Sequence, residues 1–314
     1  MKTAPCRRSG REFHVSMSSN TNKAILASIF AHTFWGFSFL ASRIALESAN
    51  MFILLSHRFL IAFLLLSVFV MTGRARVNLK GKRIHWLIAL SLLQPVIYFL
   101  GEQYGILHSN TIFSGVMIAL IPIASTFAAM LVLKEIPTAL QLVFSALSIS
   151  GVIGIGLLSS SSGALEPGGA AALMIAVCAA AAHLLISRAV ASEFSSFERT
   201  YSMMAHATVI FTACALVSVK GDITSYLSPV TKPGYLPCML FLAVLCSVGS
   251  YGLNSYAITY LTVARQTAFS NLTTAVSVFA GAIFLHEPFS LRGILYCAMI
   301  LLGIYGVQKG AGDN

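Results

Sequence analysis

The sequence has little charge. Only 10% of its 314 residues are charged, compared with about a quarter in soluble domains, while 57% are hydrophobic and the mean hydropathy is +0.83. A water-soluble fold could not cover so much apolar surface. At about 20 residues per span, the chain has room for roughly ten membrane-crossing helices and little else. We therefore expect an all-α integral membrane protein embedded in the lipid bilayer.

The residues of common enzyme sites are also scarce. The only aspartates are Asp222 and Asp313, and no HExxH, GxSxG or paired-carboxylate pattern occurs. This absence disfavours an intramembrane enzyme such as a lipid transferase or protease, because these chemistries need clustered carboxylates, metal ligands or an activated nucleophile. The six cysteines stand singly, without CxxC or Cys/His spacing, so we expect no metal and no cofactor.

Basic residues give the chain a net charge of +10, but they lie in short segments between apolar runs. Membrane topology explains them better than nucleic acid does. If the N-terminus is cytoplasmic, 15 basic residues fall on the inner side and five on the outer side, as the positive-inside rule requires. We therefore expect a multi-pass plasma membrane protein with both termini in the cytoplasm. Met17 opens an ordinary-looking start, so residues 1–16 are either upstream of the true start or a tail.

Apolar runs predict ten spans. In the first half they lie near residues 24–46, 50–72, 84–106, 110–133 and 138–158, and in the second near 169–190, 197–219, 235–258, 264–285 and 290–308. The predicted organisation is a cytoplasmic tail (1–23), a first repeat (24–158), an external linker (159–168), a second repeat (169–308) and a cytoplasmic tail (309–314). The linker is rich in turn formers and has no basic residue.

The first half of the chain is repeated in the second. A step of 152 residues carries Tyr104 onto Tyr256, and Gly151-x-x-Gly154 onto Gly303-x-x-Gly306. Five spans per copy force the two copies to enter the bilayer from opposite faces, which is typical of inverted-repeat transporters. The glycines predict close contacts between helices, because lipid provides no hydrophobic drive for helix association.

Two glutamates end corresponding spans. Glu135 and Glu287 each lie directly or closely before a proline, in two Leu-x-Glu motifs that the same step superposes. Proline favours the first turn of a helix, and a carboxylate there is stabilised by the helix dipole. We therefore expect each glutamate to stabilise the helix that follows it, and a gating or substrate-contacting role is the alternative. Pro122 predicts a kink in span 4 that span 9, with Thr274 at the matching position, does not share.

Polar residues inside the spans are the candidates for a site, because each is costly in hydrocarbon without a partner or a wet cavity. Glu102 is the most informative, and its repeat mate is the neutral Asn254. Polar stripes on spans 1, 3, 6, 8 and 9 predict one central cavity near the bilayer midplane. The candidate substrate-binding residues are Trp35, Ser38, Tyr98, Glu102, His183, Asn254, Asn271 and Thr274.

Two interpretations of Glu102 stay open. It either contacts substrate, in which case proton coupling through it is a further hypothesis, or it pairs with an arginine in the same outer half. Arg43 and Arg58 are the arginines within reach of that role. For these two, and for Arg188 and Arg199, the default expectation is that the side chain extends along the helix to the membrane interface.

The segment Trp35-Gly-Phe-Ser-Phe39 and the two Leu-x-Glu motifs resemble the ten-helix EamA-type branch of the drug/metabolite transporter superfamily, over about residues 24–308. The resemblance implies two five-helix bundles around a central cavity, alternating access, and export or exchange of small metabolites such as amino acids. Family members often carry proline in span 9 where this chain has Asn271-Leu-Thr-Thr274, so we do not expect the two halves to bend alike.

The resulting prediction is a carrier for a small polar or amphipathic solute. Trp35 and Tyr98 would stack on the solute, while Glu102, Asn254 and Asn271 would form polar contacts with it. A receptor or non-transporting scaffold built on a carrier fold is the alternative from another class, since a fold alone does not determine function. Solute flux in liposomes distinguishes the two.

Overall fold

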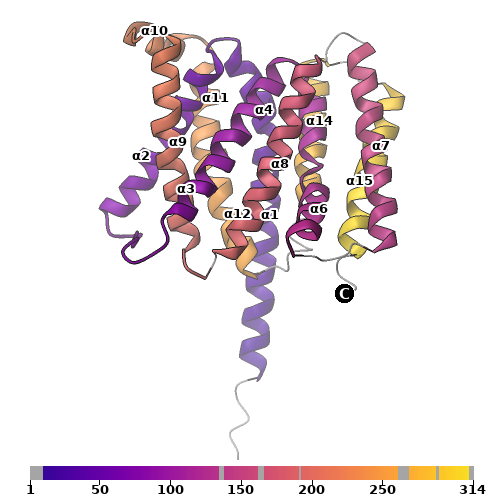
Figure 1. Ribbon diagram of the computed structural model, residues 1–314. Coiled ribbons are helices and arrows are strands. Elements are labelled where there is room, and N and C mark those ends of the chain that lie inside the picture. The colour runs from indigo at the N-terminus through magenta and orange to yellow at the C-terminus, as the bar shows by residue number, and fades with distance from the viewer. Residues whose placement is uncertain are drawn as a thin grey trace, which may run out of the picture.

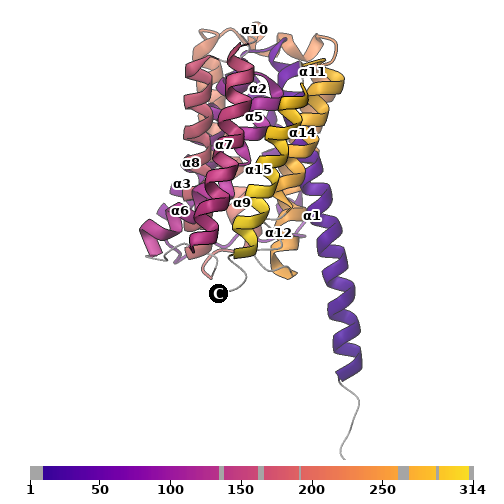
Figure 2. The same ribbon diagram turned by 90° about the vertical axis from the view of Figure 1, so that its right-hand side faces the viewer.

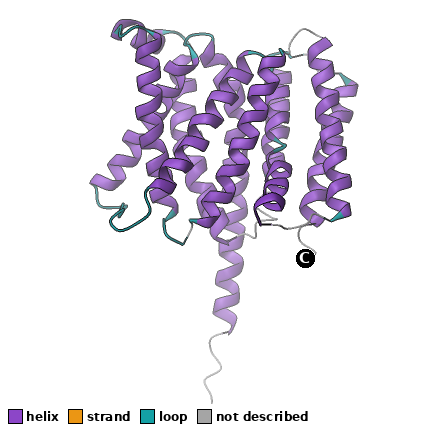
Figure 3. Cartoon of the chain, viewed as in Figure 1, coloured by secondary structure: helices purple, strands orange, loops and turns teal. Residues whose placement is uncertain are grey.

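The apolar runs form long helices that lie side by side as a bundle (Figure 1). The computed structural model describes residues 10–133, 138–161, 166–190, 192–260, 269–287 and 290–310. Within these residues there is no strand (Figure 3). Seven of their helices are long and apolar enough to cross a membrane, and three shorter apolar helices cover Thr111–Ser125, Leu272–Phe284 and Leu291–Gly306. The prediction of an all-α membrane protein is confirmed.

In the described residues the helix bounds follow the predicted spans, while the count of ten spans stays a prediction. The short α10 and η2 and the π-helical η1 and η3 were not anticipated. The first half contains α1 (Gly10–Leu46), α2 (Met51–Met71), α3 (His85–Ser91), η1 (Leu92–Ile97), α4 (Tyr98–Leu107), α5 (Thr111–Ile118), α6 (Ile121–Leu133) and α7 (Ala139–Ser161). The second contains α8 (Pro167–Ala189), α9 (Ser196–Ser218), α10 (Ile223–Leu227), η2 (Ser228–Thr231), α11 (Tyr235–Leu240), η3 (Phe241–Gly249), α12 (Ser250–Tyr260), α14 (Ser270–Phe284) and α15 (Leu291–Gly310).

Local sequence signals explain where several helices begin. The side chain of Asn50 accepts hydrogen bonds from two amides at the start of α2, and Asn110 does the same for Phe113 in α5. Ser195 and Glu198 form a reciprocal capping box at the start of α9. These side chains satisfy amide groups that have no partner within the helix. The start of α1 was not predicted. The helix begins at Gly10, whereas its apolar part, Thr21–Leu46, matches the predicted span of residues 24–46.

Spans 3 and 8 share an irregular backbone. The π-helical η1 interrupts span 3, where Gln94 leaves helical geometry (φ −143°, ψ 114°) before Pro95. The 152-residue step carries η1 onto residues 244–249, which lie inside the π-helical η3 of span 8. Both halves therefore carry a π-helical segment near mid-span, with non-helical dihedral angles inside η1. Such segments are frequent at functional sites because they re-aim side chains and release backbone groups.

Span 4 is broken and its counterpart is continuous. The helix ends at Ile118 and restarts at Ile121, next to Pro122, whereas α14 runs without interruption through Thr274. Proline removes a backbone donor and clashes with the preceding turn, so the break has a local cause. The predicted difference between the two halves is observed.

The last helices of the two halves, α7 and α15, pack through the predicted glycines. A β-carbon at Gly151 would lie 2.7 Å from the carbonyl oxygen of Tyr296, and one at Gly303 would lie 2.6 Å from that of Phe144. Phe144 and Tyr296 are themselves related by the 152-residue step. The contact is therefore reciprocal: each helix offers glycine to the same position of its partner.

The start of α1 and the end of α15 lie at the same end of the bundle, together with the loop of residues 72–84 (Figures 1 and 2). We label this the inner end, after the orientation that the basic loop of residues 72–84 predicts. The short helix α10 lies at the opposite, outer end (Figure 1).

Candidate functional site

A buried polar network lies between spans 1, 2, 3 and 8. Its principal members are Trp35 on α1, Arg58 on α2, Glu102 on α4 and Tyr251 on α12. At about 1.5 Å per residue, Trp35 lies roughly 16 Å from the outer end of its helix and Glu102 roughly 7 Å. The network thus extends from the outer half of the bundle to about mid-depth.

Glu102 is held by neutral donors. Its side chain is buried, with Oε1 accepting from the hydroxyl of Tyr98 at 2.8 Å and Oε2 from Nε2 of Gln103 at 3.0 Å. The same Gln103 nitrogen lies 3.5 Å from the Ser42 hydroxyl on α1. The carboxylate therefore has hydrogen bonds but no direct cationic partner among the described residues.

Arg58 is the residue that the sequence reasoning misplaced. It was expected to extend to the interface, but its side chain is 1% exposed. Nε donates to the Ser247 hydroxyl at 2.9 Å, and the guanidinium lies 4.4 Å from the ring centre of Phe99. Arg58 begins the third turn of α2, too far inside for its side chain to reach water when neighbouring helices surround it. It interacts electrostatically with Glu102 without forming an ion pair.

Aromatic residues complete the network at mid-depth. The indole of Trp35 donates to the carbonyl of Cys246 at 3.1 Å and meets the ring of Tyr251 edge-on, with 5.5 Å between ring centres. The Tyr251 hydroxyl accepts from Nε2 of Gln94 at 3.1 Å. Gln94 and Cys246 lie in η1 and η3, so both irregular segments contribute directly to the network.

The structure brings together three of the eight candidate residues, namely Trp35, Tyr98 and Glu102. Asn254 lies on α12, one turn beyond Tyr251. The remaining candidates make other contacts or are not described. Ser38 donates to its own helix at the Trp35 carbonyl, His183 contacts the Leu90 carbonyl on α3, Thr274 donates to the Gly115 carbonyl on α5, and the side chain of Asn271 lies outside the described residues.

The expectation that Glu287 stabilises the helix that follows it is also wrong. The Glu287 carboxylate accepts from the backbone amides of Thr111 at 2.7 Å and Ile112 at 2.9 Å. It therefore stabilises the start of α5, in the other half, rather than the α15 that follows it. The reason is tertiary: the loop between α14 and α15 reaches the start of α5, whose first amides lack partners in the helix. Glu135, the repeat mate, lies outside the described residues.

A pocket of about 470 Å³ opens beside this contact at the outer end. Arg43 is among its lining residues and donates to the carbonyl of Ile106 at 2.6 Å. The pocket is lined by Arg43, Glu47, Leu107, His108, Ser109, Asn110, Glu166, Leu285, His286 and Glu287. The predicted cavity at mid-depth stays a prediction. Arg58, Tyr98 and Glu102 are buried, whereas Trp35, Gln94 and Tyr251 are partly exposed.

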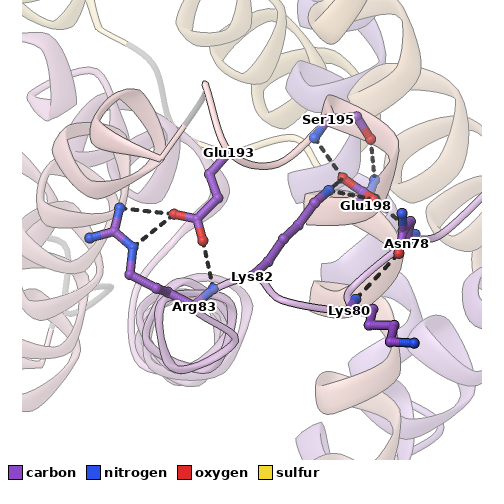
Figure 4. A network of polar contacts seen from close by, with 7 residues as sticks. All are labelled: Asn78, Lys80, Lys82, Arg83, Glu193, Ser195 and Glu198. Carbon is purple, nitrogen blue, oxygen red and sulfur yellow. Dashed lines mark hydrogen bonds and ion pairs between the residues drawn. The ribbon is translucent and has the colours of Figure 1, made fainter.

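At the inner end, two ion pairs join the loop after α2 to the loop before α9 and the first turn of α9 (Figure 4). Lys82 lies 2.8 Å from Glu198, and Arg83 lies 2.8 Å from Glu193. Glu198 also accepts from the backbone amide of Asn78 at 2.9 Å. These contacts fasten the first half to the second on the inner side, away from the buried network.

Comparison with known proteins shows the family to which the chain belongs. A model of the EamA-like transporter family matches residues 22–157 and 167–308. The chain belongs to this family. An uncharacterized transporter of Bacillus subtilis (strain 168), YcxC, is 30% identical over 90% of this chain and 92% of its own length. An uncharacterized transporter of Archaeoglobus fulgidus is 24% identical over 88% of this chain and 95% of its own length.

A solved crystal structure with the same fold covers 91% of this chain and 96% of its own, with a TM-score of 0.60 and 14% identity. Membership of the EamA-like family, in two repeats, identifies the protein as a multi-pass membrane transporter. Its partners are therefore a small-molecule substrate and the lipid bilayer.

Proposed function

We propose that the protein is a secondary transporter that moves a small polar or amphipathic metabolite, such as an amino acid, across the plasma membrane as an exporter or exchanger. The observation that carries this proposal is the buried network around Arg58 and Glu102. Two ionisable side chains inside an apolar bundle are expensive to bury and usually mark a substrate pathway. Trp35 and Tyr251 add aromatic surface beside them.

Alternating access is the mechanism we propose, with ten spans arranged as two inverted repeats. The reciprocal glycine contact of α7 and α15 supports this arrangement, because the same positions of each half meet across it. The break between α5 and α6 and the irregular η1 and η3 supply places where spans can bend. Rocking of one half against the other would open the network to each side in turn.

Flux measurements test the proposal. Purified protein in liposomes preloaded with a labelled mixture of amino acids should release at least one of them about tenfold faster than protein-free liposomes do, since a carrier provides a polar path through hydrocarbon. The matched control is Lys80→Gln, an exposed inner-loop change that should transport like wild type. If no solute from this mixture or from a cell metabolite extract crosses, the receptor or scaffold alternative replaces the carrier.

The orientation is part of the proposal. We place both termini in the cytoplasm because the basic loop of residues 72–84 lies at the same end as the start of α1 and the end of α15 (Figure 1). A reporter that is active only in the cytoplasm should therefore work when fused after α15. It should fail when inserted between Gly221 and Ile223 at the outer end, and the reverse pattern would contradict the orientation.

A further inference from the structure

The loop after α2 carries more basic side chains than the ion pairs at the inner end use. Of the five basic residues in this loop, Lys82 and Arg83 are paired with glutamates (Figure 4). The other three, Arg74, Arg76 and Lys80, are exposed and form no ion pair with any described residue. The loop therefore presents positive charge that nothing in the described part of the chain neutralises.

The turn that ends α2 fixes two of these cations at the end of the helix. Gly73 has a left-handed backbone (φ 72°), which glycine adopts without strain. The amide of Ala75 then donates to the carbonyl of Phe69 at 3.1 Å, so the chain folds back against the last turn of the helix. Arg74 and Arg76, on either side of Ala75, therefore stay next to the end of α2 instead of extending away with the loop.

The surface beside these arginines is apolar and exposed. Val68, Phe69 and Met71, in the last turn of α2, are 54%, 43% and 86% exposed. Because α2 lies at the edge of the bundle (Figure 1), these side chains face the lipid chains of the membrane. The end of α2 thus places apolar side chains and guanidinium groups next to each other, at the level where lipid chains meet headgroups.

The chemistry of this surface fits an anionic phospholipid. Two like charges two residues apart repel each other, and an anion between them relieves that repulsion. A planar guanidinium donates two parallel hydrogen bonds to phosphate oxygens. The exposed apolar side chains beside it need a ligand with hydrocarbon chains, which a soluble phosphate ester lacks. A zwitterionic phospholipid has such chains, but its ammonium group is repelled by the arginines.

We propose that Arg74 and Arg76 bind the headgroup phosphate of an anionic phospholipid, whose acyl chains lie along the exposed apolar side chains at the end of α2. Lys80 lies further along the loop and is not part of the site. The bound lipid holds the inner end of α2 at the membrane surface. The site lies outside the buried polar network, so the proposal does not depend on which solute the protein carries.

Quenching of an indole at the site tests the proposal. The two tryptophans, Trp35 and Trp86, are replaced by phenylalanine, and Met71→Trp places a fluorophore among the exposed apolar side chains. This protein is reconstituted in phosphatidylcholine vesicles that contain a minor fraction of brominated phosphatidylglycerol or of brominated phosphatidylcholine. Quenching should show a preference of about tenfold or more for phosphatidylglycerol, because each basic residue near the surface strengthens binding of an anionic lipid about fivefold.

Substitution of both arginines provides the second readout. Arg74→Gln with Arg76→Gln should abolish the preference, and salt at about 1 M should weaken it, because the screening length falls to about 3 Å. The matched control is Lys220→Gln with Lys232→Gln, which removes the same charge from two exposed lysines near α10 at the outer end and should keep the preference. An excess of soluble glycerol phosphate should also leave it unchanged, because this anion has no chains.

Native mass spectrometry of the unaltered chain gives an independent measurement if the reporter substitutions prevent folding. Phosphatidylglycerol should stay bound more often than phosphatidylcholine, and only when both arginines are present. Equal binding of the two lipids would overturn the proposal. Loss of the preference in the lysine control would also overturn it, because the net charge of the protein would then attract the lipid. Displacement by glycerol phosphate would make the surface a site for soluble phosphate and not for lipid.

Discussion

The contact between α7 and α15 and the central polar network use the repeat in opposite ways. At the contact, two pairs of related positions carry the same or a similar residue: Gly151 matches Gly303, and Phe144 matches Tyr296, although Ser148 matches Ile300. In the network, related positions differ. The 152-residue step carries Arg58 onto Ile210, Glu102 onto Asn254, Gln94 onto Cys246 and Trp35 onto Ser187.

This difference has a physical reason. Two helices can cross closely at a symmetric point only if both offer small residues there, so the halves must agree at the contact. The network has no such constraint. Arg58 and Glu102 both come from the first half, and the second half has the neutral Ile210 and Asn254 at the matching positions. The repeat supplies the architecture, and departures from the repeat supply the chemistry.

The largest effect should follow from a substitution that makes the two repeats identical at one position of the network. Glu102→Asn gives the first half the residue of the second, and transport should fall about a hundredfold, because charge-assisted hydrogen bonds to a buried carboxylate are worth about 1.5–3 kcal/mol. The rate of exchange in proteoliposomes, for a solute that the flux measurement has identified, measures this change. Size-exclusion chromatography in detergent should show a folded, monodisperse variant.

Glu102→Gln extends this experiment to proton coupling. If Glu102 carries the coupled proton, the wild-type rate should change between pH 6 and pH 8, and the variant, which cannot ionise, should show a flat profile. Equal pH profiles for the two proteins would rule out coupling through this residue. If Glu102→Asn transports at the wild-type rate, the difference between the halves in the polar network does not matter for transport, and the contrast with the α7–α15 contact fails.

A smaller effect should follow from disturbing the symmetric contact. Gly303→Ala places a β-carbon 2.6 Å from the Phe144 carbonyl oxygen, a backbone atom that cannot move aside easily. Overpacking of this kind costs about 1–3 kcal/mol. The control is Gly252→Ala on α12, where no atom lies within 4 Å of the added carbon and helix propensity favours alanine.

Thermal unfolding in detergent should thus give a lower Tm for Gly303→Ala and an unchanged or higher Tm for Gly252→Ala. Equal Tm values for the two variants would mean that α7 and α15 can separate slightly without cost, and that the contact is not a fixed point of the fold.

Sequence reasoning predicted the helices well because their signals are local. Runs of apolar residues predicted the spans, Pro122 predicted a kink in span 4, and repeated glycines predicted close contacts between helices, of which that between α7 and α15 is one. The polar network was anticipated only in part. Three of the predicted candidates, Glu102, Tyr98 and Trp35, lie in it, and they stood out because polar or amphipathic residues are conspicuous inside apolar runs.

Arg58 and Glu287 were misread because their partners lie far away in the sequence. Ser247 is 189 residues from Arg58, and Thr111 is 176 residues from Glu287. Local pattern assigned the arginine to the interface and the glutamate to the next helix, which are the correct defaults without tertiary information. One signal was available: Arg58 stands eight residues into α2, deeper than most interfacial arginines.

The smallest effect should follow from removing an ion pair at the inner end. There the two halves are joined by charged side chains and not by glycine packing or by the buried network. The backbone amide and guanidinium of Arg83 donate to Glu193 and hold the pKa of that carboxyl below its usual range. A depressed folded-state pKa gives stability that is present above the unfolded value, about 4.3, and is lost as the pH falls through the folded-state value.

Glu193→Gln should therefore lower the Tm slightly at pH 7, because exposed pairs of this kind contribute little, and the difference from wild type should shrink to nothing as the pH falls below about 4. The control is Glu47→Gln, which should show no such pH-dependent difference. Glu47 is exposed and has no ion pair in the described part of the chain. A Tm difference for Glu193→Gln that stays constant down to acidic pH would contradict this prediction. It would mean that Glu193 stabilises the fold through packing and hydrogen bonds that do not depend on its charge. The inner end would then resemble the α7–α15 contact, which also depends on packing.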